Sequence, residues 1–319
     1  MITPNYYEKF KCIGSECKNN CCMDEWDIEV DDDAMCRFNS IEGDFGVRVR
    51  ESISTENVFI RKNGRCPLLS DAGLCEMVLH GVKLCTVCDE YPRFTEFYGD
   101  YCERGISLSC EAAAKIILDN TDVVTLTGDS GICDDEFFVF LYNARNTIFT
   151  ILQDRSIEVK KRIRLVLDYG EKLQGQINNN NYSEFVYTPI DRAGECVSTE
   201  PLFDFLETLD YLSDDWYLKL RHHTDGIYDD TKVEQIAVYF VYRYFLKAVF
   251  DCDALSKLKL MAVSILSIVS LQDICGSIYE SARCYSVEVE HNEENVEMIY
   301  DEFLFNDELS TENIINMIK

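Results

Sequence analysis

Eleven of the sixteen cysteines in this chain lie within its first 110 residues, and this crowding constrains the fold more than any other feature of the sequence. Four of them fall in the stretch KCIGSECKNNCC, residues 11–22, where the last two are adjacent. The chain has 319 residues, of which 47% are hydrophobic, so it can bury a large core without the disulfides that small secreted scaffolds need. The crowded thiols therefore need a different explanation.

Disulfides, redox catalysis and metal binding are the specific uses that such thiols can have. No basic stretch followed by a long apolar one precedes the first cysteine, so we expect a cytoplasmic protein, in which thiols stay reduced. Cys85 and Cys88 have the C-x-x-C spacing of a redox dithiol, but no βαβ pattern surrounds them. Thiolates are soft ligands that select zinc, copper(I) or iron–sulfur assemblies. Metal or cluster binding is therefore the interpretation that accounts for most of the crowded cysteines.

The spacing within residues 11–22 indicates what kind of metal site to expect. Cys17 and Cys21 are four residues apart and share one face if this stretch is helical. Adjacent side chains diverge, so Cys21 and Cys22 rarely bind one mononuclear ion together. The adjacent pair therefore favours a multinuclear cluster, or two sites, over a simple four-cysteine zinc site.

The cysteines after residue 110 are scattered singly. We expect plain buried thiols at these five positions, which are Cys133, Cys196, Cys252, Cys275 and Cys284. His80 lies inside the cysteine-rich region in a non-periodic setting, and we expect it at the surface.

Glycine and proline punctuate the chain up to about residue 130, whereas the later residues recur at helical spacing. Residues 231–250 are apolar almost all round, which predicts a helix at the centre of a bundle. The apolar run 258–271 is too short to span a bilayer and predicts a buried helix. The helices expected are 109–120, capped by Ser109, and 137–152, 157–178, 200–221, 231–250, 253–275, 292–304 and 310–318. The sequence thus predicts a mainly α protein, in which an irregular cysteine-rich metal- or cluster-binding part, residues 1–130, is joined to an α-helical bundle domain, residues 131–319.

The formal net charge of the chain is −28. Such an acidic surface argues against nucleic acid as a partner, because phosphate binding needs basic side chains. It is compatible with a cationic partner, such as a lysine-bearing protein surface. We expect no transmembrane segment, while peripheral association with a membrane stays open.

The motifs of the cysteine-rich region match a known pattern. The chain has C-x4-C-x3-C-C from Cys12, C-P-L-L from Cys66 with L-C at Cys75, C-x2-Y-P-R from Cys88, and E-R-x-x-S-L-S-C ending at Cys110. This combination resembles the flagellin lysine-N-methylase family, a branch of a cysteine-cluster superfamily described as zinc- or iron-chelating. The resemblance continues in the helical part, in YFVYRYFLKAVFD (239–251) and VEHNEENVEMIYDEF (289–303). The chain departs from the family after Cys110, where Glu111 and Ala112 replace a proline and a glutamate.

The resemblance implies a set of metal ligands and an activity. The implied ligands, which we expect to converge in space, are Cys12, Cys17, Cys21, Cys22, Cys66, Cys75, Cys88 and Cys110. Cys36, Cys85 and Cys102 are less regular in the family. The family is taken to transfer methyl groups from S-adenosylmethionine to lysine amines of flagellin, with a 4Fe–4S cluster involved. The alternative is a non-enzymatic protein that binds zinc or iron through these thiols and docks a protein partner.

Amine methylation sets its own requirements, because a lysine amine with a pKa of about 10.4 must lose its proton before it attacks a methyl sulfonium. The stretch YPRFTEFYGDYCERG, residues 91–105, offers aromatic rings for a cation and carboxylates for a proton. Its candidate catalytic residues are Tyr91, Arg93 and Glu103, although the alternating aromatics also fit a strand or hairpin packed on the core. Neither a glycine-rich nucleotide loop nor the radical C-x3-C-x2-C spacing is present, so the S-adenosylmethionine site cannot be assigned from the sequence.

Overall fold

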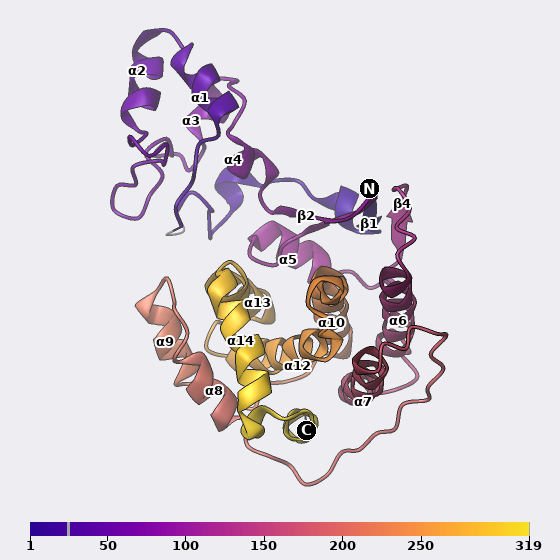
Figure 1. Cartoon of the computed structure of the whole chain (residues 1–319). Coiled ribbons are helices and arrows are strands. Elements are labelled where there is room, and N and C mark those ends of the chain that lie inside the picture. The colour runs from indigo at the N-terminus through magenta and orange to yellow at the C-terminus, as the bar shows by residue number, and fades with distance from the viewer. Residues whose placement is uncertain (24–25, 319) are drawn as a thin grey trace.

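The structure of the chain is a computed structural model that describes residues 1–23 and 26–318. It is mainly helical, as predicted, with one small sheet (Figure 1). The helices are α1 (Asp32–Asn39), α2 (Gly43–Glu51), α3 (Glu76–Leu79), α4 (Thr86–Glu90), α5 (Glu111–Leu118), α6 (Glu136–Leu152), α7 (Val159–Asn178), α8 (Glu200–Leu206), α9 (Asp214–Leu220), α10 (Asp230–Tyr244), α11 (Ala248–Asp251), α12 (Ala254–Leu271), α13 (Ile278–Tyr285), α14 (Glu293–Phe305) and α15 (Thr311–Met317).

A four-stranded sheet joins the beginning of the chain to residues about a hundred positions later. Its strands are β1 (Ile2–Pro4), β2 (Arg93–Tyr98), β3 (Tyr101–Ile106) and β4 (Leu126–Gly128), in the order β2-β3-β1-β4. β1 runs parallel to β3 and antiparallel to β4, while β2 and β3 form a hairpin. We did not predict this sheet, because three-residue strands such as β1 and β4 are too short to show a period of two. The hairpin is the alternative that the alternating aromatics left open.

The large hydrophobic core lies between the sheet and the helices that follow it. α10 is buried from Val233 to Tyr242, which confirms that residues 231–250 are central, although the α-helix ends at Tyr244. α12 is buried along almost its whole length, as expected for residues 258–271. Among the described residues α12 is the one helix long and apolar enough to cross a membrane, and 94% of it lies inside the protein.

A second, smaller core lies in the cysteine-rich region, between Ile28 and Cys85. Figure 1 shows α1, α2, α3 and α4 together at one end of the molecule, apart from the helices of the large core. Asp31 holds part of this region in place, because its side chain accepts hydrogen bonds from the Ala34 amide at the start of α1 and from the Thr86 amide at the start of α4. The division of the chain at residue 130 stays a prediction, and the structure adds that residues 22–88 share a core of their own.

Three helix predictions differ from the structure. The cap of α5 is Cys110 rather than Ser109, and its side chain makes no capping hydrogen bond. The helix expected at 200–221 is broken between α8 and α9, because the amides of Asp210 and Leu212 donate to Asn295 and Glu288 instead of continuing the helix. α13 was not predicted, and it continues into a π-helical turn at Ser286–Glu290.

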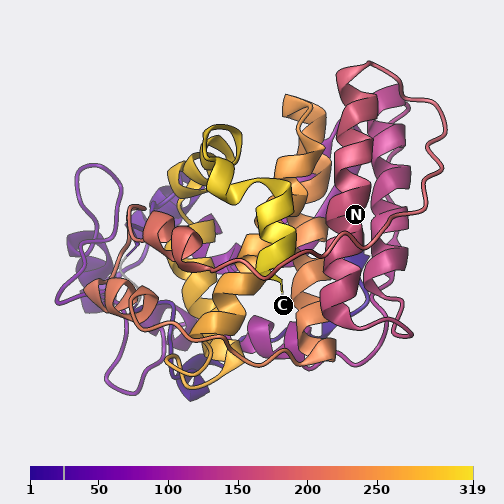
Figure 2. The same ribbon diagram turned by 90° about the horizontal axis from the view of Figure 1, so that it is seen from below.

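Residues 179–199 run as an extended segment over the outside of the helices, from α7 to α8 (Figure 2). The segment is fixed at its end by Asn316 of α15, which accepts a hydrogen bond from the Gly194 amide through its side chain at 2.7 Å and one from the Val197 amide through its carbonyl at 3.1 Å.

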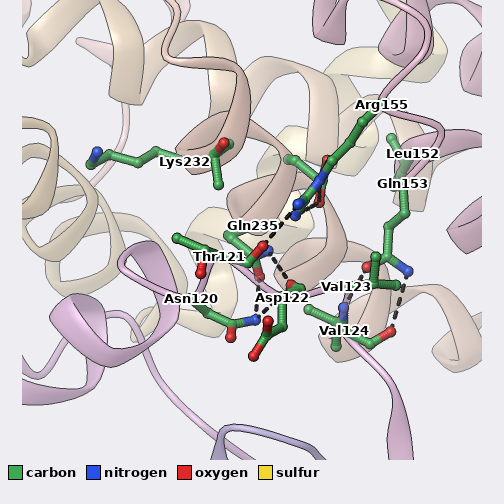
Figure 3. Close-up of polar contacts among 12 residues, drawn as sticks. Asn120, Thr121, Asp122, Val123, Val124, Leu152, Gln153, Arg155, Lys232 and Gln235 are labelled. Carbon is green, nitrogen blue, oxygen red and sulfur yellow. Dashed lines mark hydrogen bonds and ion pairs between the residues drawn. The ribbon is translucent and has the colours of Figure 1, made fainter.

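A buried polar network joins the ends of α5 and α6 to α10 (Figure 3). Glu234 is fully buried and pairs with Arg155 at 2.8 Å and Arg162 at 2.6 Å. Beside it, the Gln153 side chain bonds both the amide and the carbonyl of Val124. These contacts tie the start of α10 to the segments that follow α5 and α6.

Candidate thiol site

Six thiols of the cysteine-rich region form a connected set, in which each lies within interaction range of at least one other. Cys22 contacts Cys21 and Cys66 through hydrogen bonds, and Cys85 contacts Cys88 in the same way. Cys88 also lies within electrostatic range of Cys22 and Cys66, and Cys75 within range of Cys66 and Cys85. We call these six the inner thiol group, which comprises Cys21, Cys22, Cys66, Cys75, Cys85 and Cys88.

Local backbone structure explains why these residues meet. The Cys66 amide donates to the Cys22 carbonyl at 2.8 Å, which places the two thiol segments side by side. A turn through Gly73, whose φ of +74° favours glycine, brings Cys75 back opposite Leu69. Cys85 stands at the N-cap of α4, and hence Cys88 follows about one turn later on the same face.

Three further thiols gather at the start of α5. Cys17 and Cys12 both lie within electrostatic range of Cys110, the N-cap residue of that helix. Glu111 fixes the approaching loop, because its carboxylate accepts hydrogen bonds from the amides of Lys18 at 2.9 Å and Asn19 at 3.0 Å. We call Cys12, Cys17 and Cys110 the α5 thiol group.

The expectation that Cys17 and Cys21 share a helical face is wrong. The stretch contains a single 3-10 turn, Gly14–Glu16, after which the chain leaves the helical conformation at Cys17. As a result Cys17 belongs to the α5 thiol group, whereas Cys21 belongs to the inner thiol group with Cys22.

All eight predicted ligands belong to one of these two groups, rather than to a single cluster. Cys85, which the sequence analysis treated as irregular, belongs to the inner thiol group, and its C-x-x-C spacing with Cys88 was the signal for it. The two other irregular cysteines stay outside: Cys36 is exposed, and Cys102 is buried in β3.

The close thiols change one another's acidity. The hydrogen bond with Cys21 is the main cause that raises the pKa of Cys22 to about 12. Burial, followed by the charge of Glu111, raises the pKa of Cys17 to about 12. Cys85 is the exception, because the hydrogen bond from Cys88 lowers its pKa to about 7. Most of these thiols therefore keep their protons at neutral pH when no cation is bound.

Thiols that crowd in this way have the chemistry of a soft-metal donor set, in which a cation replaces the protons. The positions of these side chains define a metal site less clearly than the chemistry of the thiols does. Within residues 1–23 and 26–318, no three histidine, cysteine or acidic side chains are placed so that they could hold a metal ion as they stand. All sixteen cysteines lie in the described part of the chain and are free thiols in the structure.

Three aromatic rings from separate parts of the chain meet at the edge of the small core, against which Trp26 packs. The ring of Trp26 lies 5.3 Å from that of Tyr91 and 5.0 Å from that of His291, centre to centre. The Tyr91 and His291 rings are 6.3 Å apart. Trp26 and Tyr91 are partly exposed and His291 is exposed, so these rings, the aromatic triad, present a surface to solvent.

A buried polar network lies behind the aromatic triad. Glu290, next to His291 in the chain, accepts hydrogen bonds from the hydroxyls of Tyr239 at 3.1 Å and Tyr244 at 3.1 Å. Arg243 donates to the Tyr239 hydroxyl at 2.8 Å. The stretches 239–251 and 289–303 that carry the family resemblance therefore contact each other here.

A line of hydroxyl groups connects Tyr91, through the S-L-S-C motif, with Ser286. Tyr91 donates to the Ser109 hydroxyl at 3.2 Å, and Ser109 donates to that of Ser107 at 2.9 Å. Ser107 in turn lies 3.3 Å from the hydroxyl of Ser286 in the π-helical turn. The motif thus links Tyr91 to the helical part.

The three catalytic candidates have different surroundings. Tyr91 belongs to the aromatic triad. The Arg93 guanidinium lies 5.1 Å from the centre of the Phe10 ring. Glu103 is buried and its two carboxylate oxygens accept hydrogen bonds from Arg145 at 2.6 and 2.7 Å, with a third from the Tyr101 hydroxyl. Of the three, Tyr91 is the one that belongs to the aromatic triad, and it is partly exposed.

Outside the cysteine-rich region, the prediction of buried single thiols is wrong for most positions. Cys196 and Cys252 are exposed, and Cys133 and Cys275 are partly exposed. Cys284 is buried, but it contacts Cys275. His80 is exposed, as expected, and stacks on Phe45.

Comparison with known proteins gives a distant similarity over part of the chain. No protein-family model and no solved structure matches it. A protein named lysine-N-methylase from Salmonella typhimurium is 24% identical over 142 residues, which are 40% of this chain and 34% of that protein. The flagellar biosynthetic protein FliU from Salmonella muenchen is 25% identical over 142 residues, 40% of this chain and 81% of that protein. The match thus spans about a third of the length of the lysine-N-methylase, and the chain is a distant relative of proteins with these names.

Proposed function

We propose that this chain is a protein lysine N-methyltransferase, which uses S-adenosylmethionine and acts on flagellin or another lysine-bearing protein. The observation that carries the proposal is that the motif stretches meet at one place. Tyr91, the S-L-S-C motif and the stretch around His291 come from different parts of the chain, yet they adjoin at the aromatic triad, whose Trp26 packs, like Cys22, against the small core. The names of the distant relatives supply the class of reaction.

The aromatic triad suits the substrate of such a reaction. Aromatic faces attract ammonium and sulfonium cations, most strongly where water is partly excluded. Desolvation, followed by the charge of Arg243, lowers the pKa of His291 to about 4, so its imidazole stays neutral at pH 7 and would accept a hydrogen bond from the amine rather than keep its proton. The net charge of −28 favours the approach of a basic protein.

The inner thiol group would hold the 4Fe–4S cluster, with zinc as the alternative metal. An iron–sulfur cluster bound there would supply an electron-transfer centre. The α5 thiol group contacts the loop that leads to Cys21 and Cys22, so Cys12, Cys17 and Cys110 would shield or complete the site.

The test is methyl transfer by anaerobically purified protein that is incubated with S-adenosylmethionine and the flagellin of its own organism. Lysine-bearing peptides should gain one or more methylene increments by mass spectrometry. Cys22→Ser should abolish the gain, since a hydroxyl is a poor ligand for a soft metal. Cys36→Ser is the matched control, because Cys36 is an exposed cysteine of the same region outside both thiol groups.

The visible spectrum of the same protein identifies the metal, because iron–sulfur clusters absorb broadly at about 400 nm and zinc is colourless. Full methylation by Cys22→Ser would make the thiols bystanders. A metal-loaded wild type that transfers no methyl group to any lysine would overturn the proposal in favour of a non-enzymatic metal-binding protein.

A further inference from the structure

Two cysteines of the helical part form a pair that the thiol site does not involve. Cys275 lies just after α12, and Cys284 lies in the second turn of α13. Gly276, with φ of +81°, reverses the chain between them, and the Ser277 side chain caps α13. The short connection brings the two thiols into hydrogen-bond contact.

Charged side chains surround this pair. The Lys219 ammonium lies 3.9 Å from the Cys284 sulfur and also pairs with Asp215 at 2.6 Å. Arg283 lies 3.7 Å from the same sulfur. The carboxylate of Glu280 accepts a hydrogen bond from the Cys284 thiol at 3.4 Å.

The two thiols are not equivalent. The contact with Cys284, with the charge of Lys219 as a further cause, outweighs burial and the charge of Glu280 and lowers the pKa of Cys275. The contact with Cys275 and burial raise the pKa of Cys284. Cys275 is partly exposed, whereas Cys284 is buried. Cys275, the more exposed thiol of the pair, is thus also the more acidic one. The same combination is found where an accessible nucleophilic thiol lies next to a second thiol that resolves its sulfenic acid.

We propose that Cys275 and Cys284 form a peroxide-reactive dithiol that closes to a disulfide. In the first step the Cys275 thiolate attacks one oxygen of a hydroperoxide, so an S–O bond forms, the O–O bond breaks and the departing oxygen takes a proton to leave as water or an alcohol. In the second step the Cys284 sulfur attacks the sulfenic acid, an S–S bond forms, and the hydroxide that leaves takes the thiol proton. The two thiols lose two electrons and the peroxide gains them.

The pair lies one side chain away from the thiol loop. Glu280, which contacts Cys284, also accepts a hydrogen bond from the Asn19 side chain at 2.7 Å. Asn19 is the residue whose amide binds Glu111 beside the α5 thiol group. Through Glu280 and Asn19, the Cys275–Cys284 pair is therefore connected to the loop of residues 12–22.

The test is a peptide map of the full chain after brief treatment with hydrogen peroxide, in which remaining thiols are alkylated before digestion. The Cys275–Cys284 disulfide should be the main new crosslink of the helical part. The sulfenic acid of Cys275 should form at least about threefold faster than that of Cys196 or Cys252, which are exposed thiols without such partners. Cys284→Ser should leave Cys275 as a sulfenic acid that dimedone traps, and Cys196→Ser, the matched control, should change neither product.

Lys219→Gln provides a variant that keeps both cysteines. It removes the neighbouring positive charge and should slow the oxidation of Cys275 by about threefold. Oxidation of Cys275 no faster than that of Cys196, or crosslinks from Cys275 to other cysteines in preference to Cys284, would overturn the inference. The wild-type map and Lys219→Gln decide this even if a cysteine variant fails to fold.

Discussion

The cysteine-rich region and the helical part are built on cores of very different composition. The small core draws on residues from Ile28 to Cys85 and includes cysteines among its few buried side chains. The large core contains most of α10 and α12 and binds the hairpin β2–β3 as well. A segment the size of residues 22–88 rarely gains enough from burial alone and usually needs a metal or crosslinks. The helical part needs neither a metal nor crosslinks, because its core is so large that it tolerates even buried charges.

Removal of metal should produce the largest difference between the two regions. If thiolate ligation stabilises the small core, a chelator under reducing conditions should make the amides of residues 22–88 exchange at nearly unfolded rates, while those of α10 and α12 stay protected. Hydrogen exchange followed by mass spectrometry measures both regions in one sample. Unchanged protection of residues 22–88 would show that the small core holds together without metal.

Glu103→Gln should have the next largest effect, and it acts on the large core. The substitution leaves the buried Arg145 without its carboxylate, so unfolding should become easier by about 3–5 kcal/mol. Glu96→Gln is the matched control, because Glu96 lies opposite Glu103 in the hairpin but forms a partly exposed pair with Lys247, and it should change stability by less than about 1 kcal/mol.

Urea unfolding measures both hairpin variants, and the double variant Glu103→Gln/Arg145→Met should recover part of the loss. A Glu103→Gln protein that unfolds like wild type but loses methylation would assign Glu103 to catalysis instead.

Lys259→Met should have the smallest effect, and in the opposite direction. Burial lowers the pKa of Lys259 from 10.5 to about 8, so at pH 7 the folded protein carries a buried ammonium whose one hydrogen bond is to the Phe303 carbonyl. Methionine removes this cost and should stabilise the helical part by about 1–3 kcal/mol at pH 7. Above pH 8 the folded wild type releases the proton before the unfolded chain does, so the wild type gains stability up to about pH 10.5 and the advantage of the variant shrinks.

Urea unfolding of Lys259→Met at pH 7 and pH 9.5, beside wild type, gives both values. Lys257→Met is the control, since Lys257 pairs with Asp251 and its loss should not stabilise the protein. An equal advantage for Lys259→Met at both pH values would contradict the burial of a titrating amine.

The sequence predicted those parts of the structure in which one periodic pattern dominates. Three helices, α6, α10 and α12, were recognised because their apolar residues repeat over several turns. α6 follows Asp135, the residue that caps it. β1 and β4 could not be recognised, because their positions depend on pairing with distant strands. The break between α8 and α9 likewise depends on Asn295 and Glu288, which lie some 75 to 85 residues away.

For the candidate site, the sequence proposes residues but not how they group. The eight cysteines that the motif spacings select fall into the two thiol groups, and Tyr91 belongs to the aromatic triad. That Cys17 separates from Cys21, and that Cys85 is a member of the inner thiol group, follows from a 3-10 turn and a helix cap that local spacing does not specify. His291 was also missed as a site residue, because its contact with Trp26 is tertiary.

The place of β1 in the sheet changes the entropy of assembling the thiols. The chain leaves the sheet after Pro4 and returns to it at Arg93, so the segment between them, which carries the inner thiol group together with Cys12 and Cys17, is an insertion whose two ends are anchored in one sheet. A loop with fixed ends has already lost much of its freedom, and further closures within it cost less chain entropy than in a free segment. The sheet therefore preorganises this insertion through its two anchor points, even though the insertion has a core of its own.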